Sequence, residues 1–156
     1  MFNDIITNIS LTEDLALITV AGIPADGGAA AEILTGIAEK GKNVDMITQT
    51  PPYNDVISLS FTVAEEDLSE IVAVVGGAKK IHPSLRTDVN PGNSKIMVFS
   101  EKMVETPGVA ASMFRVLHEA GIRVKLITTS DVDISVLVGA ADGEGAVVRL
   151  QETGNN

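Results

Sequence analysis

The chain has 156 residues, 45% of them hydrophobic and 3% aromatic, which is typical of one folded domain or two small ones with aliphatic cores. Eleven Lys and Arg against 21 Asp and Glu give a net charge of −10, which argues against nucleic acid and against anionic membrane surfaces as partners. The absence of cysteine excludes disulfides and thiolate chemistry, and no apolar run reaches the about 18 residues of a membrane span.

The first half of the chain predicts strands separated by two helices. β-Branched or alternating apolar residues predict strands at 5–9, 15–21, 44–50, 57–63 and 78–81, the last a short closing strand. A polar connector is expected at 10–14, and the Pro-rich segment 51–55 is expected to be a loop. Apolar stripes of helical period predict helices at 30–40 and 65–75, ended by Gly41 and by Gly76-Gly77 respectively.

The second half repeats this order after a linking segment. Residues 82–94 contain two prolines, a glycine and two asparagines, and we interpret them as a connector whose turn is Asn90-Pro91-Gly92. Strands are then expected at 95–99, 123–129 and 132–138, and helices at 108–120 and 141–150. A loop is expected at 100–107, and the last helix is weakened by Gly143 and Gly145.

An internal repeat underlies this symmetry. The segment from Gly28 to Thr48 recurs from Gly108 to Thr128 at a constant offset, since 108 − 28 and 128 − 48 both give 80. The offset falls to 75 at the alternating strands (136 − 61), because the first unit carries five extra residues in the loop 51–55. Each unit reads strand-helix-strand-strand-helix, and the strand at 5–9 is left to complete the second sheet.

Particular segments resemble the paired ACT domains of aspartate kinase, over nearly the whole chain. The matching segments are Gly22-Ile23-Pro24, Gly28-Ala29-Ala30-Ala31, Gly41-Lys42-Asn43-Val44-Asp45-Met46-Ile47-Thr48-Gln49, Leu59-Ser60-Phe61-Thr62-Val63, Pro107-Gly108-Val109-Ala110-Ala111 and Thr129-Ser130-Asp131-Val132-Asp133-Ile134-Ser135-Val136. The resemblance implies an α+β fold of two ferredoxin-like βαββαβ ACT domains, with the N-terminal strand completing the second domain's sheet. It places domain 1 at 11–82, the connector at 83–93 and domain 2 at 5–10 plus 94–151.

The same resemblance implies a regulatory module without catalytic residues. ACT pairs of this family sense lysine or threonine and pass the signal to a kinase catalytic domain or subunit, which this chain lacks. Two chains pair as a homodimer, and the effector lies between the first unit of one chain and the second unit of the other. No cofactor is expected, since ATP and Mg²⁺ would belong to the kinase domain. Because the segment Met1–Asp4 does not resemble the start of a signal peptide, a cytoplasmic location is expected.

The expected effector site consists of two glycine-led helix starts with their neighbouring strand ends. A helix start offers unpaired N–H groups and a positive dipole end to a carboxylate, and the amide of Gln49 can both donate and accept. The resemblance gives the effector-binding residues as Ile23, Asp26, Gly28, Ala29, Ala30, Gln49, Arg123, Val124, Ser130 and Asp131.

The sequence departs from the family pattern at both turns, and two other readings stay open. Ala25 stands where the family has an acid, with Asp26 one position along, and Arg123 stands where Asn is common. The chain is therefore either an amino-acid sensor, a free-standing tandem ACT protein that acts by binding another protein, or a scaffold that only dimerises. Thermal-shift titration with amino acids would separate the sensor from the scaffold.

Other chemistry receives little support from the residues. His82 and His118 have no partners at metal-ligand spacing and are interpreted as solvated. Asp131 and Asp133 suit a turn better than a cation site. The glycine pairs lack the Gly-Lys-Ser/Thr of a phosphate loop, and no Ser-His-Asp or Cys-His set is present.

Overall fold

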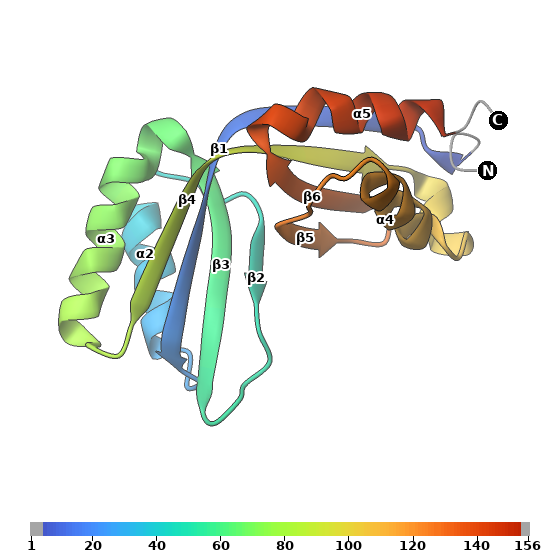
Figure 1. Ribbon diagram of the computed structural model, residues 1–156. Helices are drawn as coiled ribbons and strands as arrows, with labels where there is room; N and C mark the ends of the chain where they lie inside the picture. Colours follow the sequence, from blue (N-terminus) through green and yellow to red (C-terminus); the bar gives the residue numbers. More distant parts are fainter. Residues whose placement is uncertain (1–4, 154–156) are drawn as a thin grey trace. The chain divides into compact units, whose positions relative to one another are not determined.

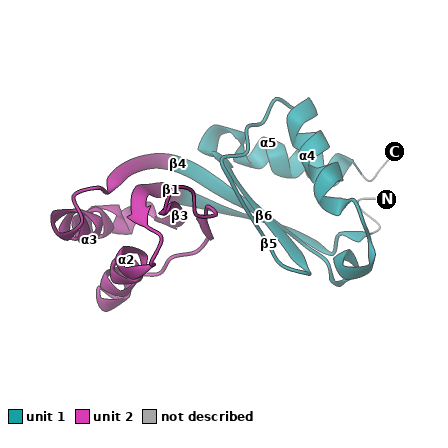
Figure 2. Ribbon diagram, turned by 90° about the horizontal axis from the view of Figure 1, so that it is seen from below, with its two compact units in different colours: residues 1–14, 92–156 teal, residues 15–91 magenta. Residues whose placement is uncertain are grey.

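The computed structural model describes residues 5–153 and divides the chain into two compact units, residues 15–91 and residues 1–14 with 92–156 (Figure 2). The strands are β1 (Asn8–Pro24), β2 (Ile47–Gln49), β3 (Val56–Ala64), β4 (Arg86–Phe99), β5 (Leu126–Thr129) and β6 (Asp133–Gly139). The helices are α2 (Gly28–Glu39), α3 (Leu68–Ile81), α4 (Val109–Glu119) and α5 (Gly143–Glu152), with short 3-10 turns at 65–67, 101–105 and 140–142 (Figure 1).

The strands are arranged in the order β2-β3-β1-β4-β6-β5, and every pairing of known register is antiparallel. Strands β1 and β4 each have residues in both units. The unit 15–91 therefore has the order β2-β3-β1-β4, and the other unit has β1-β4-β6-β5. Thr7 N–H donates to Phe99 O at 2.9 Å beside this last sheet. The prediction that an N-terminal strand completes the second sheet is confirmed, but this strand is the first part of β1, which begins at Asn8, and the bounds predicted for it, 5–9, are wrong.

Each unit has its own hydrophobic core between its sheet and its two helices. Strand β3 shows the alternation on which its prediction rested, since Ile57, Leu59, Phe61 and Val63 are all at most 3% exposed. Helices α2 and α3 cover the sheet of the unit 15–91, and α4 and α5 cover the other (Figure 2). The core side chains that are completely buried include Ile18, Ile33, Phe61, Ile71 and Leu85 in one unit and Ile96, Met113, Val136 and Leu150 in the other.

The helix around Gly76 and Gly77 corrects two predictions. Residues 78–81 were expected to form a strand after a glycine stop, but they are the last turn of α3. The buried positions Ile71, Val75 and Ala78 continue the helical period through both glycines, and their burial outweighs the low helix propensity of glycine.

Two expected connectors are parts of long strands. Residues 10–14 belong to β1, although Thr12, Glu13 and Asp14 are exposed, because this half of β1 is a sheet edge where polar side chains are tolerated. The connector expected at 83–93 is largely β4, which begins at Arg86 and runs through the predicted Asn90-Pro91-Gly92 turn. Gly92 has φ of +75°, so the irregularity at this turn is absorbed within the strand.

The five-residue insertion of the first unit forms a tight hairpin. Tyr53 and Val56 exchange backbone hydrogen bonds of 3.0 and 3.1 Å, and Asn54 and Asp55 between them both have positive φ. This is the pattern of a type I′ turn, which matches the twist of the flanking strands. The expected loop 100–107 contains the 3-10 turn at 101–105. Among the residues described, no helix has the length and hydrophobicity needed to cross a membrane.

Candidate effector site

A cavity of about 360 Å³ lies at the N-terminus of α4. Gly108 precedes the helix with φ of +95°, and its carbonyl accepts the first helical hydrogen bond, from Ser112 N–H at 2.9 Å. The N–H groups of the first turn, from Val109 to Ala111, have no acceptor within the helix. The cavity is lined by Met103, Val104, Thr106, Gly108, Val109, Ala110, Thr129, Ser130, Asp131 and Ile134.

The loop after β5 forms the opposite wall of this cavity and is held by Ser130. The hydroxyl of Ser130 accepts from Val132 N–H at 3.3 Å and from Asp133 N–H at 3.2 Å, and it donates to the Asp133 carboxylate. The backbone adds a bond of 2.9 Å from Ser130 N–H to Asp133 O. Ser130 is thus used to fix the loop, and the exposed Asp131 is the acidic residue that lines the cavity.

The start of α2 has the same backbone shape with a different partner. Gly27 precedes the helix with φ of +82°, and its carbonyl accepts from Ala31 N–H at 3.0 Å. The Asp26 carboxylate accepts from Gly28 N–H at 2.9 Å, so one first-turn donor is already bonded. Ala25 N–H donates to Asp55 O at 2.9 Å, which ties this turn to the type I′ hairpin.

The structural counterparts at the two helix starts are one residue further apart than the offset of 80 in the sequence repeat. The repeat paired Gly28 with Gly108, but the residues with the same conformation and role are Gly27 and Gly108, which are 81 apart. The helix ends keep the offset of 80, from Gly41 to Gly121, because α2 is one residue longer than α4. Asp26 is consequently the counterpart of Pro107.

The structure brings some of the predicted site residues together. Ser130 and Asp131 share the α4 cavity with Gly108, Val109 and Ala110. Arg123 is exposed and Val124 half-buried ahead of β5, and neither lines this cavity.

The other predicted residues lie in the unit 15–91. Ile23 is completely buried in the core, and Gln49 is exposed at the end of β2, paired with Leu59. Gly28 is exposed at the start of α2, where Ala29 and Ala30 are buried. Their role in binding stays a prediction.

The predicted effector-binding set contains only Ser130 and Asp131 of the residues that line this cavity, and Met103, Val104 and Thr106 lie outside every segment that the prediction used. The sequence contained a signal for two of them, because Met103 and Val104 are apolar residues in a polar segment that was expected to be a loop. Val104 is 65% exposed, so it presents an apolar surface at the mouth of the cavity.

The chemistry of the α4 cavity suits a small zwitterion. The N–H groups and the positive dipole end of α4 attract a carboxylate. The Asp131 carboxylate attracts an ammonium group, and Met103 and Ile134 offer contact to an aliphatic side chain. A free amino acid carries all three groups.

Ionisable groups elsewhere act within the fold. His82 Nε2 lies 3.0 Å from Glu32 Oε2, so this histidine, interpreted as solvated, contacts α2. Lys42 Nζ lies 2.7 Å from Asp67 Oδ1 and 3.2 Å from Glu70 Oε1, and the hydrogen bonds to these two carboxylates raise the pKa of Lys42. No cluster of His, Asp and Glu capable of holding a metal occurs among residues 5–153.

The chain has the architecture of an ACT-type protein, with this sheet order, two helices on each sheet and glycine-led helix starts. Residues 96–153 match the family described as ACT domain. Aspartokinase from Bacillus sp. (strain MGA3) is 30% identical over 150 residues, which are 96% of this chain and 36% of that protein.

Two solved structures match over nearly their whole chains. The ligand-free regulatory subunit of aspartate kinase from Thermus thermophilus is 29% identical with a TM-score of 0.85, covering 94% of this chain and 97% of that one. A chain of the structure of aspartokinase alpha and beta subunits is 30% identical with a TM-score of 0.86, covering 97% and 99%. The chain belongs to the aspartokinase family. It spans 36% of the length of the Bacillus aspartokinase.

Proposed function

We propose that this chain is an amino-acid-sensing regulatory module of an aspartate kinase. A small effector of the lysine or threonine type binds at an interface between two copies and controls the phosphorylation of aspartate by a catalytic domain or subunit. The α4 cavity carries this proposal, because it combines free helix N–H groups with the Asp131 carboxylate and apolar walls.

The proposed mechanism is differential binding. An effector that binds one arrangement of the paired ACT units more tightly shifts the population toward it, and the kinase responds to that shift. The partners are therefore a second copy of the chain, an aspartate kinase catalytic domain or subunit, and the effector. We place the protein in the cytoplasm and assign no cofactor to this chain.

Thermal-shift titration with lysine, threonine and the other amino acids tests the proposal. A ligand that binds only the folded state stabilises it by RT ln(1 + [L]/Kd), so a sensor shows an unfolding temperature that rises with the logarithm of the amino-acid concentration above Kd. Ala110→Leu fills the cavity and should abolish the rise. Ala111→Leu is the matched control, because Ala111 is exposed on the same turn and does not line the cavity.

The alternative of a scaffold without a working site has one observation in its favour. The Asp26 carboxylate already bonds the start of α2 and repels an incoming carboxylate there. If no amino acid shifts the unfolding temperature of the wild type, the sensor proposal fails and the scaffold, or a tandem ACT protein that acts by binding other proteins, takes its place.

A further inference from the structure

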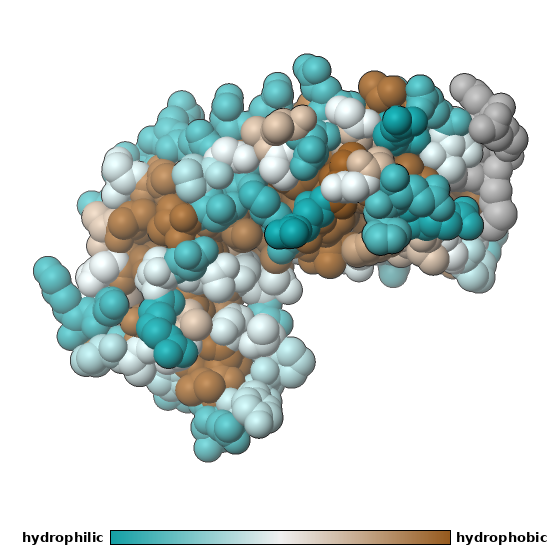
Figure 3. Space-filling view, viewed as in Figure 1, coloured by the Kyte–Doolittle hydropathy of each residue, from teal (hydrophilic) through white to brown (hydrophobic). Residues whose placement is uncertain are grey.

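The outward face of α3 is apolar although it faces solvent. Val72 is 40% exposed, and Gly76 and Gly77 are exposed beside it. No charged residue occurs between Glu70 and Lys79 on this helix. A helix that covers a sheet normally carries charged or polar residues on its outward face. Figure 3 shows hydrophobic residues at the surface over α3, so this face differs from the usual pattern.

A groove of about 550 Å³ runs between α2 and α3 beside this face. The two helices are antiparallel, because Gly36 lies against Val74, whereas the earlier Glu32 contacts the later His82. Ile81 lies at the same end of the groove as Glu32 and is 66% exposed. The groove is lined by Ala31, Glu32, Thr35, Gly36 and Glu39 of α2 and by Ala73, Val74, Gly77, Ala78 and Ile81 of α3.

The internal repeat pairs this groove with one in the other unit. Helices α2 and α4 keep the repeat offset of 80, and α3 and α5 begin 75 residues apart, since 143 − 68 gives 75. Under these offsets the buried Ile37 and Val75 pair with the buried Leu117 and Leu150, so the registers of the two helix pairs agree. The two grooves can therefore be compared position by position.

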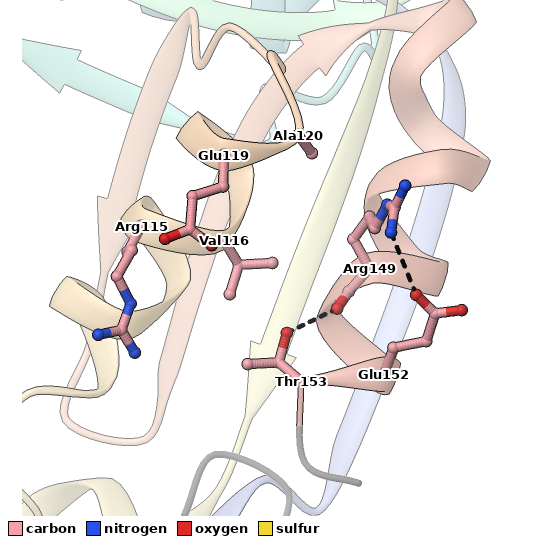
Figure 4. A pocket seen from close by; sticks show the side chains of 7 residues that line it. All are labelled: Arg115, Val116, Glu119, Ala120, Arg149, Glu152 and Thr153. Atoms are coloured by element: carbon pink, nitrogen blue, oxygen red, sulfur yellow. Dashed lines mark hydrogen bonds and ion pairs between the residues drawn. The ribbon is translucent and has the colours of Figure 1, made fainter. Parts of the chain in front are cut away.

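The counterpart groove is charged where the α2–α3 groove is not. Two arginines and two glutamates line a cavity of about 490 Å³ between α4 and α5 (Figure 4), and these are Arg115, Glu119, Arg149 and Glu152. In the α2–α3 groove three of these four positions hold Thr35, Val74 and Gly77, and the fourth, that of Glu119, holds Glu39. The shared architecture therefore does not require an apolar groove.

The charges left in the α2–α3 groove are both acidic. Glu32 and Glu39 line it seven residues apart on α2, so their side chains lie on one side of this helix, about 10 Å apart along its axis. Glu32 Oε2 lies 3.0 Å from His82 Nε2, whereas Glu39 has no ion pair within residues 5–153. Lys79 and Lys80, at the end of α3, do not line the groove. One wall is thus acidic and the other apolar.

We propose that the α2–α3 groove binds an amphipathic helix of another protein, with an apolar stripe that faces α3 and two basic residues that face Glu32 and Glu39. The two basic residues stand seven positions apart, because a helix that lies along α2 has the same rise per residue. An amphipathic helix in an apolar groove is a recurrent mode of recognition. The net charge of −10 attracts a basic partner at long range.

The dimensions of the groove match a helical occupant. Its lining residues run from Ala31 to Glu39 and from Ala73 to Ile81, which is about 12 Å of each helix, so a partner helix contacts it over about two turns. A Cβ at Gly77 would meet no atom within 4 Å, so packing inside the unit does not require glycine there. The missing side chain lets a partner backbone approach α3 closely.

A second copy of the chain does not provide this complementarity. Its own groove presents the same two acids, Glu32 and Glu39, and no basic lining residue. Like charges repel, whereas arginine or lysine on a partner helix supplies the opposite charge. The inference goes beyond the proposed function, since it involves neither the α4 cavity nor a free amino acid.

Fluorescence anisotropy with a synthetic helix tests the proposal on the whole chain. The probe is a labelled, alanine-rich peptide of about 18 residues, which is long enough to be partly helical in water. It carries a stripe of leucines and, beside the stripe, two arginines seven positions apart. We expect a Kd below about 100 µM, and no binding up to about 1 mM would overturn the inference.

Two matched peptides separate docking in the groove from general attraction to an acidic protein. In the first, the two arginines lie on the side opposite the leucines, and this peptide of equal charge should bind at least about tenfold more weakly. In the second, a central proline breaks the helix and should abolish binding. Equal affinities for the probe and either matched peptide would contradict a helical occupant held by Glu32 and Glu39.

Charge reversal tests the acidic wall. Glu39→Lys should weaken binding of the probe by about tenfold, because it replaces an attraction by a repulsion. Glu119→Lys is the matched control, since it makes the same change in net charge at the counterpart position. A probe with glutamates in place of the arginines should prefer Glu39→Lys to the wild type. Equal losses of affinity in the two variants would overturn the inference.

Filling the groove tests the apolar wall. Gly77→Leu occupies the space that a partner backbone needs and should weaken binding of the probe by about tenfold or more. Gly145→Leu is the matched control, because an added Cβ meets no atom within 4 Å at either glycine. Far-UV circular dichroism checks that both variants keep their helices. Equal Kd values for Gly77→Leu and Gly145→Leu would overturn the inference.

Sedimentation equilibrium identifies the alternative occupant. Self-association of the wild type that Gly77→Leu removes and Gly145→Leu keeps would show that a second copy fills the groove, and would overturn the inference. None of these experiments depends on amino-acid binding, so the proposed function can fail while this docking site stands.

Discussion

The Asp26 carboxylate accepts a hydrogen bond of 2.9 Å from Gly28 N–H, so this N–H group at the start of α2 is no longer available to a ligand. Its counterpart in the other unit is Pro107, which has no such group, and no side chain caps α4. Two helix starts of the same backbone shape therefore differ in electrostatics. The start of α4 is the more favourable one for a carboxylate.

Asp26→Asn should improve effector binding at the start of α2. The asparagine Oδ1 can accept the same hydrogen bond, so the free energy of unfolding should change by less than about 0.5 kcal/mol. Loss of the negative charge should lower the Kd for an amino acid at this exposed start by about fivefold, since like charges about 4 Å apart in a water-like dielectric repel by about 1 kcal/mol. Isothermal titration calorimetry measures the Kd and the number of sites.

Asp26→Ala is the control for the hydrogen bond itself. It removes both the charge and the acceptor, so it should also destabilise the fold by about 1 kcal/mol. Binding by Asp26→Asn that matches the wild type in both Kd and stoichiometry would show that the start of α2 holds no effector.

Two glycine-to-alanine changes should act in opposite directions. Gly22 has φ of +74°, and an added Cβ would lie 2.4 Å from Ser84 O, so Gly22→Ala should destabilise by about 2 to 4 kcal/mol. Gly145 lies in α5, and its added Cβ meets no atom within 4 Å, so Gly145→Ala should stabilise by up to about 1 kcal/mol. Urea unfolding measures both, and a stable Gly22→Ala would contradict the close approach.

Strands and helices with a clear period were predictable from the sequence. The alternation of β3 and the apolar stripes of α2 and α4 gave these elements within a few residues. The errors lie where tertiary context overrides local signals. Gly76 and Gly77 do not end α3, because the buried stripe of Ile71, Val75 and Ala78 continues through them.

The positions of the two glycine-led helix starts were predictable from the sequence, and their role in effector binding stays a prediction. The helix starts follow from the repeated glycine turns, and Ser130 and Asp131 do lie at the α4 cavity. The internal repeat paired Gly108 with Gly28, although its structural counterpart is Gly27. Two adjacent glycines, Gly27 and Gly28, fit the repeat pattern equally well. Conformation distinguishes them, since Gly27 has positive φ.

The contacts of Lys42 should make stability depend on pH in the alkaline range. Its carboxylate partners raise its pKa in the folded state above the unfolded value of 10.5. The stabilising contribution is therefore fully present below that unfolded value and is lost as the pH rises through the folded pKa. The unfolding temperature of the wild type should exceed that of Lys42→Met at pH 7 to 9, and the difference should shrink above about pH 10.5.

Lys40→Met is the matched control for Lys42. Lys40 is exposed beyond the end of α2 and has no ion pair within the described residues. Its replacement should leave the unfolding temperature close to that of the wild type at every pH. A difference between wild type and Lys42→Met that stays constant up to pH 11.5 would exclude the ion pairs as its cause.

Two buried serines should respond oppositely to alanine. Ser94 is completely buried in β4, and within residues 5–153 its Oγ has no hydrogen-bond partner. A Cβ added at Gly143 would lie 3.0 Å from this oxygen, so the site is tightly filled. Ser94→Ala removes an unsatisfied buried hydroxyl and should stabilise by about 1 kcal/mol.

Ser100 is the matched comparison, since it is as deeply buried but its hydroxyl donates to Ile5 O and accepts from Lys102 N–H at 3.1 Å. Ser100→Ala leaves these two backbone groups without their partner and should destabilise by about 1 to 3 kcal/mol. Urea unfolding of both variants gives the comparison. If Ser94→Ala loses as much stability as Ser100→Ala, the Ser94 hydroxyl is hydrogen-bonded in solution, and the contrast between the two serines is wrong.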